Sequence, residues 1–92
     1  MKILALTIVC GERRKNGDRL LALFDVEMAD FRLRQCSLLR TSRKFLLAQP
    51  PKLTDTARVI EILNPDIRRA MAEAAWIEFT RSGGVDPEES SE

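Results

Sequence analysis

The stretch "RLLALFDVEMADFRLRQCSLLR", residues 19–40, decides the fold. From Ala22 onward its first half alternates apolar and polar side chains, which is typical of a strand with one buried face. Ala29-Asp30 then fits a tight turn, and a second strand-like run follows it. The stretch therefore predicts an antiparallel hairpin of two strands, Arg19–Met28 and Phe31–Arg40.

Pairing across this predicted hairpin brings opposite charges together. With the turn at Ala29-Asp30, Glu27 faces Arg32 and Asp25 faces Arg34 on one face of the sheet, and the apolar residues share the other. Opposite-charge pairs across neighbouring strands contribute roughly 0.2–1 kcal/mol each. Arg32 and Arg34 are therefore interpreted as solvated partners of the two carboxylates.

One irregularity interrupts the alternation in the second strand of the hairpin. Phe31 and Leu33 point to one face, but Cys36 and Leu38 would point to the other. Either a β-bulge near Gln35 restores the parity, or a second copy of the chain covers both faces of this strand.

The flanking sequence predicts further strands and two turns. Further strands are predicted at Lys2–Val9, Lys44–Gln49 and Ala57–Leu63. The first has little alternation, which indicates burial on both faces. Asn16-Gly17 favours a hairpin turn, Thr41-Ser42 a second turn, and Pro50-Pro51 ends the strand that precedes it.

The clearest helix signal begins at Asn64. Asn64 is a good N-cap, Pro65 fits the first helical position, and Asp66 favours the positive end of the helix dipole. The predicted core stripe is Ile67, Ala70, Met71, Ala74 and Ile77, widened by Ala72, Trp76 and Phe79. The predicted fold class is α+β: a small antiparallel or mixed sheet of four to five strands, followed by one C-terminal helix that ends at Gly83-Gly84. Residues 1–82 form the domain and residues 83–92 a flexible acidic tail.

The charge of the chain is unevenly distributed. It has 15 basic and 14 acidic residues, and four of the acids lie in residues 86–92, which contain no base. The folded body is therefore basic, and basic surfaces bind phosphates. The candidate phosphate-binding residues are Arg40, Arg43, Lys44, Lys52, Arg68 and Arg69.

Catalytic and membrane functions are disfavoured by the composition. The chain has no histidine and no tyrosine, so the usual general bases and phenolic donors are absent. It shows no glycine-rich phosphate loop and no metal-ligand spacing, so we expect no enzyme activity, no cofactor, no metal and no small-molecule substrate. No run approaches the roughly 18 apolar residues of a membrane helix. Cys10 and Cys36 are interpreted as packed thiols of a cytoplasmic protein, and the chain's aromatic side chains are interpreted as core.

The ordered set of segments resembles the septation regulators typified by stage V sporulation protein G. "ALFDVEMADFRLRQCSLLR" is similar to that family's second strand, turn and third strand. "KFLLAQPPK" resembles the family's segment after the next turn, and "IEILNPDI" with "MAEAAWIEF" resembles its entry to the helix and the helix itself. The positions that match are Lys44, Ala48, Pro50, Lys52, Pro65, Ile67, Ala74, Glu78 and Phe79.

The resemblance implies a small α+β domain that pairs through its sheet into a homodimer, and a bacterial regulator that binds DNA or RNA. The apolar content of the strands also favours a homodimer, since a single helix covers little of it. The alternative is a non-catalytic protein-interaction module that acts as a dimeric adaptor in cell division or transcription.

Overall fold

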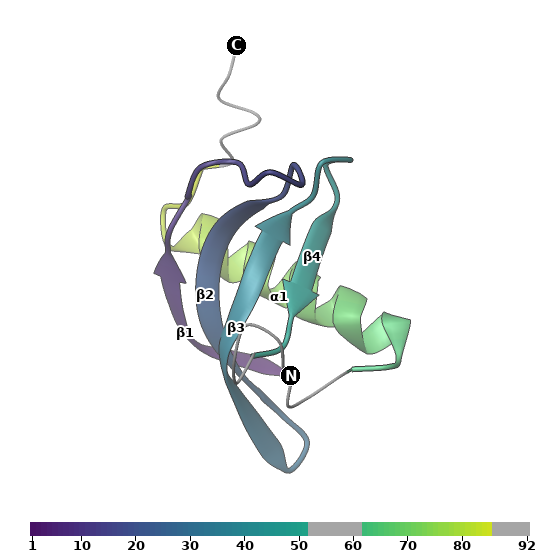
Figure 1. Cartoon of the computed structure of the whole chain (residues 1–92). Helices are drawn as coiled ribbons and strands as arrows, with labels where there is room; N and C mark the ends of the chain where they lie inside the picture. The colour runs from purple at the N-terminus through teal and green to yellow at the C-terminus, as the bar shows by residue number, and fades with distance from the viewer. Residues whose placement is uncertain (52–61, 86–92) are drawn as a thin grey trace.

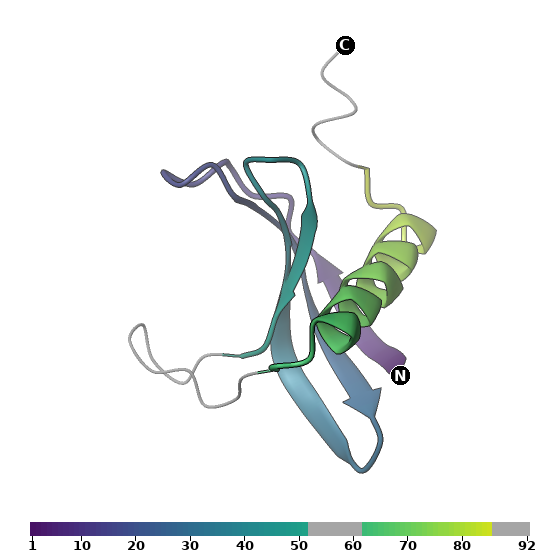
Figure 2. The ribbon, with the colours of Figure 1, turned by 90° about the vertical axis from the view of Figure 1, so that its right-hand side faces the viewer.

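The chain folds into a four-stranded antiparallel sheet with one helix against one of its faces, as seen in a computed structural model that describes residues 1–51 and 62–85 (Figures 1 and 2). The elements are β1 (Lys2–Ile8), β2 (Arg19–Met28), β3 (Phe31–Arg40), β4 (Leu46–Gln49) and α1 (Pro65–Arg81). The strands follow one another across the sheet in chain order. The predicted α+β class is therefore confirmed, with four strands. The predicted strand Ala57–Leu63 lies mostly outside the described residues; its last two residues are not in a strand.

The β2–β3 hairpin has the predicted bounds and turn. Met28 pairs with Phe31 and Glu27 with Arg32, and the Arg32 guanidinium lies 3.5 Å from the Glu27 carboxylate. Ala29 adopts φ +51°, which allows the chain to reverse in two residues. The predicted charge pair between Glu27 and Arg32 is confirmed.

A bulge at Gln35 resolves the irregular alternation of β3. Gln35 has φ +62°, and the register between β2 and β3 shifts there by one residue. The bulge brings Cys36 onto the same face as Leu33, so the first of the two explanations for the parity is confirmed. It also changes the partner of Asp25, whose carboxylate accepts a hydrogen bond from the Gln35 N–H (3.1 Å). The expected pairing of Asp25 with Arg34 is therefore wrong.

The core lies between the sheet and α1. Its buried members on the strands are Leu21, Ala22, Phe24, Val26, Leu33, Cys36, Leu38 and Ala48. From α1 the core receives Met71, Ala72, Ala75 and Phe79. Ile67 and Ile77, predicted to be core, are 38% and 56% exposed. Two sides of α1 carry apolar residues. The side that includes the large Phe79 ring packs on the sheet, because burying it there removes more apolar area from water than burying the side with Ile67 and Ile77.

β1 is an edge strand, so the prediction that it is buried on both faces is wrong. Most of its residues are exposed, including Leu4 (37%) and Ile8 (39%), and Val9 just after it is 42% exposed. An apolar run indicates a strand but does not reveal its position in the sheet. That position is fixed here by the sequential order of the four strands.

Both ends of α1 are capped within the chain. At the start, the Asn64 side chain accepts a hydrogen bond from the Asp66 N–H (2.9 Å), as predicted for an N-cap. At the end, Gly83 adopts φ +94° and the Gly84 N–H donates to the Phe79 carbonyl (2.8 Å). The two glycines therefore form a Schellman cap on the helix. Residues 86–92 of the predicted tail lie outside the described part of the chain.

Candidate nucleic-acid interface

The connection between β1 and β2 ends in a tight basic turn. The Arg14 N–H donates to the Asp18 carbonyl (2.7 Å), and the Gly17 N–H donates to the Arg14 carbonyl (2.9 Å). Gly17 has φ +90°, the left-handed conformation that a three-residue hairpin loop needs at its last position. The predicted turn at Asn16-Gly17 is confirmed. The basic side chains of this turn are Arg13, Arg14 and Lys15.

The connection between β3 and β4 repeats the same geometry. The Thr41 N–H donates to the Phe45 carbonyl (2.8 Å), and the Lys44 N–H donates to the Thr41 carbonyl (2.9 Å). The predicted turn at Thr41-Ser42 is confirmed, and it extends to Phe45. Lys44 occupies the left-handed position with φ +69°, where the first turn has glycine. A lysine side chain is thus held at a position that favours glycine.

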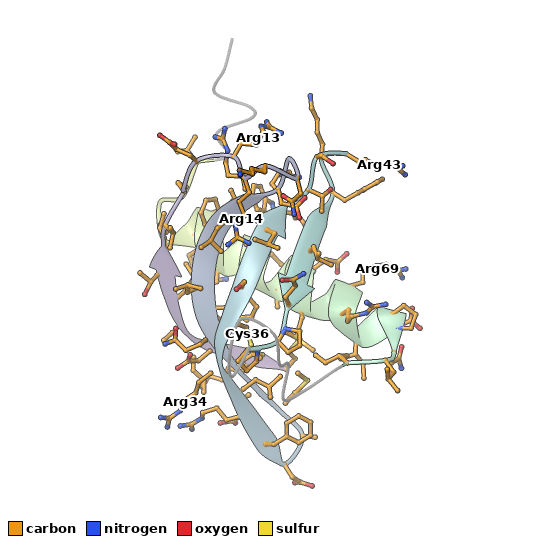
Figure 3. All side chains as sticks on the ribbon, in the orientation of Figure 1. Arg13, Arg14, Arg34, Cys36, Arg43 and Arg69 are labelled. Carbon is orange, nitrogen blue, oxygen red and sulfur yellow. The ribbon has the colours of Figure 1, made fainter. Side chains whose placement is uncertain are left out.

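The two turns touch each other at one end of the sheet. A Cβ atom added to Gly17 would lie 2.5 Å from the Ser42 Cβ, so the first turn packs directly on the second. Figure 2 shows both connections at the same end of the sheet, and Figure 3 shows Arg13 and Arg43 there. We call the side chains of this end the loop-end basic cluster: Arg13, Arg14, Lys15, Arg43 and Lys44.

Two further arginines lie on the strands at this end. Arg19 of β2 is directly opposite Arg40 of β3 in the register. The Arg40 guanidinium donates to the Lys44 carbonyl (2.9 Å) and lies over the Trp76 ring, 5.1 Å from its centroid. Trp76 in turn stacks on Phe79 at 5.3 Å between ring centroids. Arg40 therefore ties the second turn to the helix.

The six predicted phosphate-binding residues are divided by the structure. Arg43 and Lys44 are exposed in the loop-end basic cluster, with Arg40 behind them. Arg68 and Arg69 lie on the first turns of α1. Figure 3 shows Arg69 away from the cluster, and Arg69 pairs with Asp66 at 3.3 Å. Lys52 lies outside the described residues.

Sequence reasoning missed the three basic residues of the first turn. Glu12 and Asp18 flank Arg13, Arg14 and Lys15, so this segment does not stand out as strongly basic in the sequence. The signal that could have identified them is the run of three consecutive basic residues just before Asn16-Gly17. A hairpin turn at Asn16-Gly17 places such a run at the end of the sheet, where its side chains are exposed to solvent. Over residues 12–19 and 40–45, seven cationic side chains stand against these two acids.

Two aromatic side chains are also not where they were expected. Phe24 and Phe79 are buried and Trp76 is half-buried, as predicted. Phe31 is 57% exposed and Phe45 is 67% exposed, so the interpretation of these two as core is wrong. Phe31 is the first residue of β3, and Phe45 lies just before β4. The helix does not cover either position.

Other kinds of site find little support in the described part of the chain. Among residues 1–51 and 62–85, no three histidine, cysteine or acidic side chains are grouped to hold a metal ion. Nor does that part contain a helix long and apolar enough to cross a membrane. Both cysteines are free thiols. Burial, with a smaller contribution from the Asp25 carboxylate, raises the pKa of the Cys36 thiol to about 11.

Comparisons of the chain with protein-family models, with curated proteins and with solved structures found no match.

Proposed function

We propose that this protein binds nucleic acid, and that the loop-end basic cluster holds the phosphates. Five exposed cationic side chains project from two turns that are packed together. Fixed backbone geometry reduces the conformational entropy lost when a ligand orders these side chains. A polyanion gains from this arrangement because each phosphate contact releases condensed counterions.

The observation that carries the proposal is the packing of the two basic turns on each other, which brings the five cationic side chains of the cluster to one end of the sheet. Arg19 of β2 lies at this end, opposite Arg40 of β3. Among the described residues, the buried Arg19 Nε has no hydrogen-bond partner. A phosphate oxygen would supply the missing acceptor, which supports anion binding at this end of the sheet.

The cellular role proposed here is that of a cytoplasmic regulator. It is supported by the resemblance to the septation regulators and by the basic body, and it covers DNA as well as RNA. We further propose that the protein acts as a homodimer. The exposed edge of β1, with Leu4, Ile8 and Val9, supports this because an apolar edge strand readily pairs with another strand.

A specific observation favours the second candidate, a protein-interaction module. Met28, Leu33 and Ile67 line an apolar groove between the β2–β3 hairpin and the start of α1, beside the exposed Phe31 and Leu63. Such grooves accept apolar side chains of partner proteins. Retention on heparin at low salt distinguishes the two candidates, since only a polyanion-binding surface is held there.

The salt dependence of binding tests the proposed function. With roughly four to six phosphates contacted, the affinity for a random-sequence oligonucleotide should fall by about two to three powers of ten between 50 and 200 mM salt. The double variant Arg43→Gln/Lys44→Gln should reduce the slope of log affinity against log salt by about 1.4–1.8, if both residues contact phosphates. It should weaken binding to all sequences about equally, because phosphate contacts do not specify bases.

The matched control removes two charges from the other end of the sheet. Arg32→Gln/Arg34→Gln makes the same change in net charge, and Figure 3 shows Arg34 far from the cluster. This variant should leave the salt slope unchanged and lower the stability modestly through the loss of the Arg32–Glu27 pair. Equal losses in both double variants, or binding that does not respond to salt, would sink the proposal.

A further inference from the structure

We propose that the loop-end basic cluster takes single-stranded nucleic acid and that Phe45 is a platform on which one base stacks. The inference rests on the proposed function and names its class of substrate. Stacking needs an aromatic face that is open to solvent, held in place, and close to groups that bind the backbone of the strand. Phe45 meets each of these conditions.

The Phe45 side chain is open to solvent on the side of the sheet away from the helix. It is 67% exposed, the largest value for an aromatic side chain in residues 1–51 and 62–85. Its neighbour Leu46 packs against the core, and successive side chains of a strand point to opposite faces. Single exposed apolar residues are common on proteins, so exposure alone would not make Phe45 a site.

The backbone of Phe45 is fixed from two sides. Its N–H donates to the Thr41 Oγ1 (3.1 Å), and its carbonyl accepts from the Thr41 N–H (2.8 Å). The preceding Lys44 carbonyl accepts from Arg40, whose guanidinium lies over Trp76. A ring on this support loses little conformational entropy when a base covers it.

The surroundings of Phe45 suit a strand rather than a duplex. Arg43 and Lys44 directly precede the ring in the chain, and the basic turn of residues 14–18 packs against Ser42. A single strand can lay its phosphates on these cations while it turns a base face toward Phe45. In a duplex the base faces are stacked on one another, so only the phosphates are available.

Phe31 provides an internal comparison for this argument. It is also exposed (57%), but it lies at the opposite end of β3, beside an apolar groove that includes Met28 and Leu33. The nearby Arg32 is paired with Glu27. Arg34 also lies beside Phe31, together with the acids Glu27 and Asp30, so Phe31 is a matched aromatic whose surroundings carry no net positive charge.

The test compares the affinities of Phe45→Ala, Phe45→Trp and Phe31→Ala with that of the wild type, for each of three probes separately. The probes are the single strand dT20, an abasic 20-mer with the same phosphates, and a dT20·dA20 duplex, at one fixed salt concentration. Removing one stacked base should weaken binding of dT20 by about 5- to 100-fold. Phe45→Ala should show this loss with dT20 alone, Phe45→Trp should restore the affinity, and Phe31→Ala should behave as the wild type.

Fluorescence gives a second measurement, which would not change if Phe45 had only a structural role. The tryptophan introduced by Phe45→Trp should be quenched by dT20 and not by the abasic strand, after subtraction of the Trp76 signal of the wild type. Equal effects of Phe45→Ala on all three probes, or no effect on any, would overturn the stacking role even if Arg43→Gln/Lys44→Gln still weakens binding. No binding of any probe by the wild type would instead overturn the proposed function itself.

Discussion

Lys44 is the residue at which stability and the proposed function oppose each other. It adopts φ +69°, and the equivalent position of the neighbouring turn is Gly17, with φ +90°. A residue with a Cβ in this conformation costs roughly 1–2 kcal/mol. Strain of this kind is often retained at functional sites, and here it places a positive charge between Arg43 and the exposed Phe45 ring.

Replacing Lys44 by glycine should therefore make the protein more stable and bind nucleic acid more weakly. We expect the free energy of unfolding to rise by about 0.5–1 kcal/mol, because the lost strain exceeds the entropy that glycine adds to the unfolded chain. The affinity for a single strand should fall and its salt slope should become shallower by about 0.7. Chemical denaturation and oligonucleotide titration measure the two effects.

Ala29→Gly is the control for this change. Ala29 also has a positive φ (+51°), but it lies in the β2–β3 turn at the other end of the sheet. It should raise stability by a similar amount and leave the affinity unchanged. If Lys44→Gly is destabilising, or if it binds as tightly as the wild type, the interpretation of Lys44 as a strained functional residue is wrong.

At the scale of elements, the two basic turns act as one unit because Gly17 packs on Ser42. A methyl group on Gly17 would lie 2.5 Å from the Ser42 Cβ and would also meet an unfavourable φ. Gly17→Ala should therefore separate the turns, lower stability by at least about 1 kcal/mol and weaken binding. Gly17→Ala does not change the net charge, so a loss of affinity in this variant would come from the separation of the turns and not from a lost cation.

A second substitution separates the clash from the backbone strain. Ser42→Gly removes the Cβ that Gly17→Ala would strike, so the double variant should recover part of the affinity while the φ strain remains. If the effects of Gly17→Ala and Ser42→Gly on affinity simply add in the double variant, the two turns do not cooperate in binding.

The parts of the strands and the helix that could be predicted are those whose structure depends on residues close together in the sequence. The β2–β3 hairpin could be predicted because alternation, turn and the charges of Glu27 and Arg32 all lie within adjacent residues. The Asn64 cap of α1 is equally local. The buried side of α1 could not be predicted in this way. Ile77 and Phe79 both continue an apolar stripe, and only the packing of the helix on the sheet decides which of the two is buried.

The candidate site was only half predictable for a related reason. Arg43 and Lys44 could be found as exposed charges that flank a turn, without any knowledge of the sheet. That Arg14 and Lys15 belong beside them depends on two connections, distant in sequence, meeting at one end of the sheet. The exposure of Phe45 depends likewise on where α1 ends its coverage of the strands.

At the scale of the whole molecule, we expect a homodimer that forms through the edge of β1. Leu4 and Ile8 are exposed on this strand (37% and 39%), and introducing lysine on an edge strand opposes pairing with another strand. The wild type should sediment as a dimer at micromolar concentration, and Leu4→Lys/Ile8→Lys should sediment as a folded monomer. Circular dichroism of the variant checks that the fold is kept.

Ile77→Lys is the control for the surface of the dimer. Ile77 is 56% exposed on the outer side of α1, so its replacement adds a lysine without touching the edge strand. It should leave the dimer intact. A wild-type monomer, or a dimer that only Ile77→Lys disrupts, would exclude the β1 edge as the contact.

The different environments of the two thiols have a practical consequence. Cys36 is fully buried, and its pKa of about 11 leaves almost none of the reactive thiolate at neutral pH. Cys10 is partly exposed just after β1, at the start of the connection that leads to Arg13 and Arg14. A maleimide dye added to the native chain should therefore attach at this one place, so the unaltered protein already has a single position for a reporter beside the loop-end basic cluster.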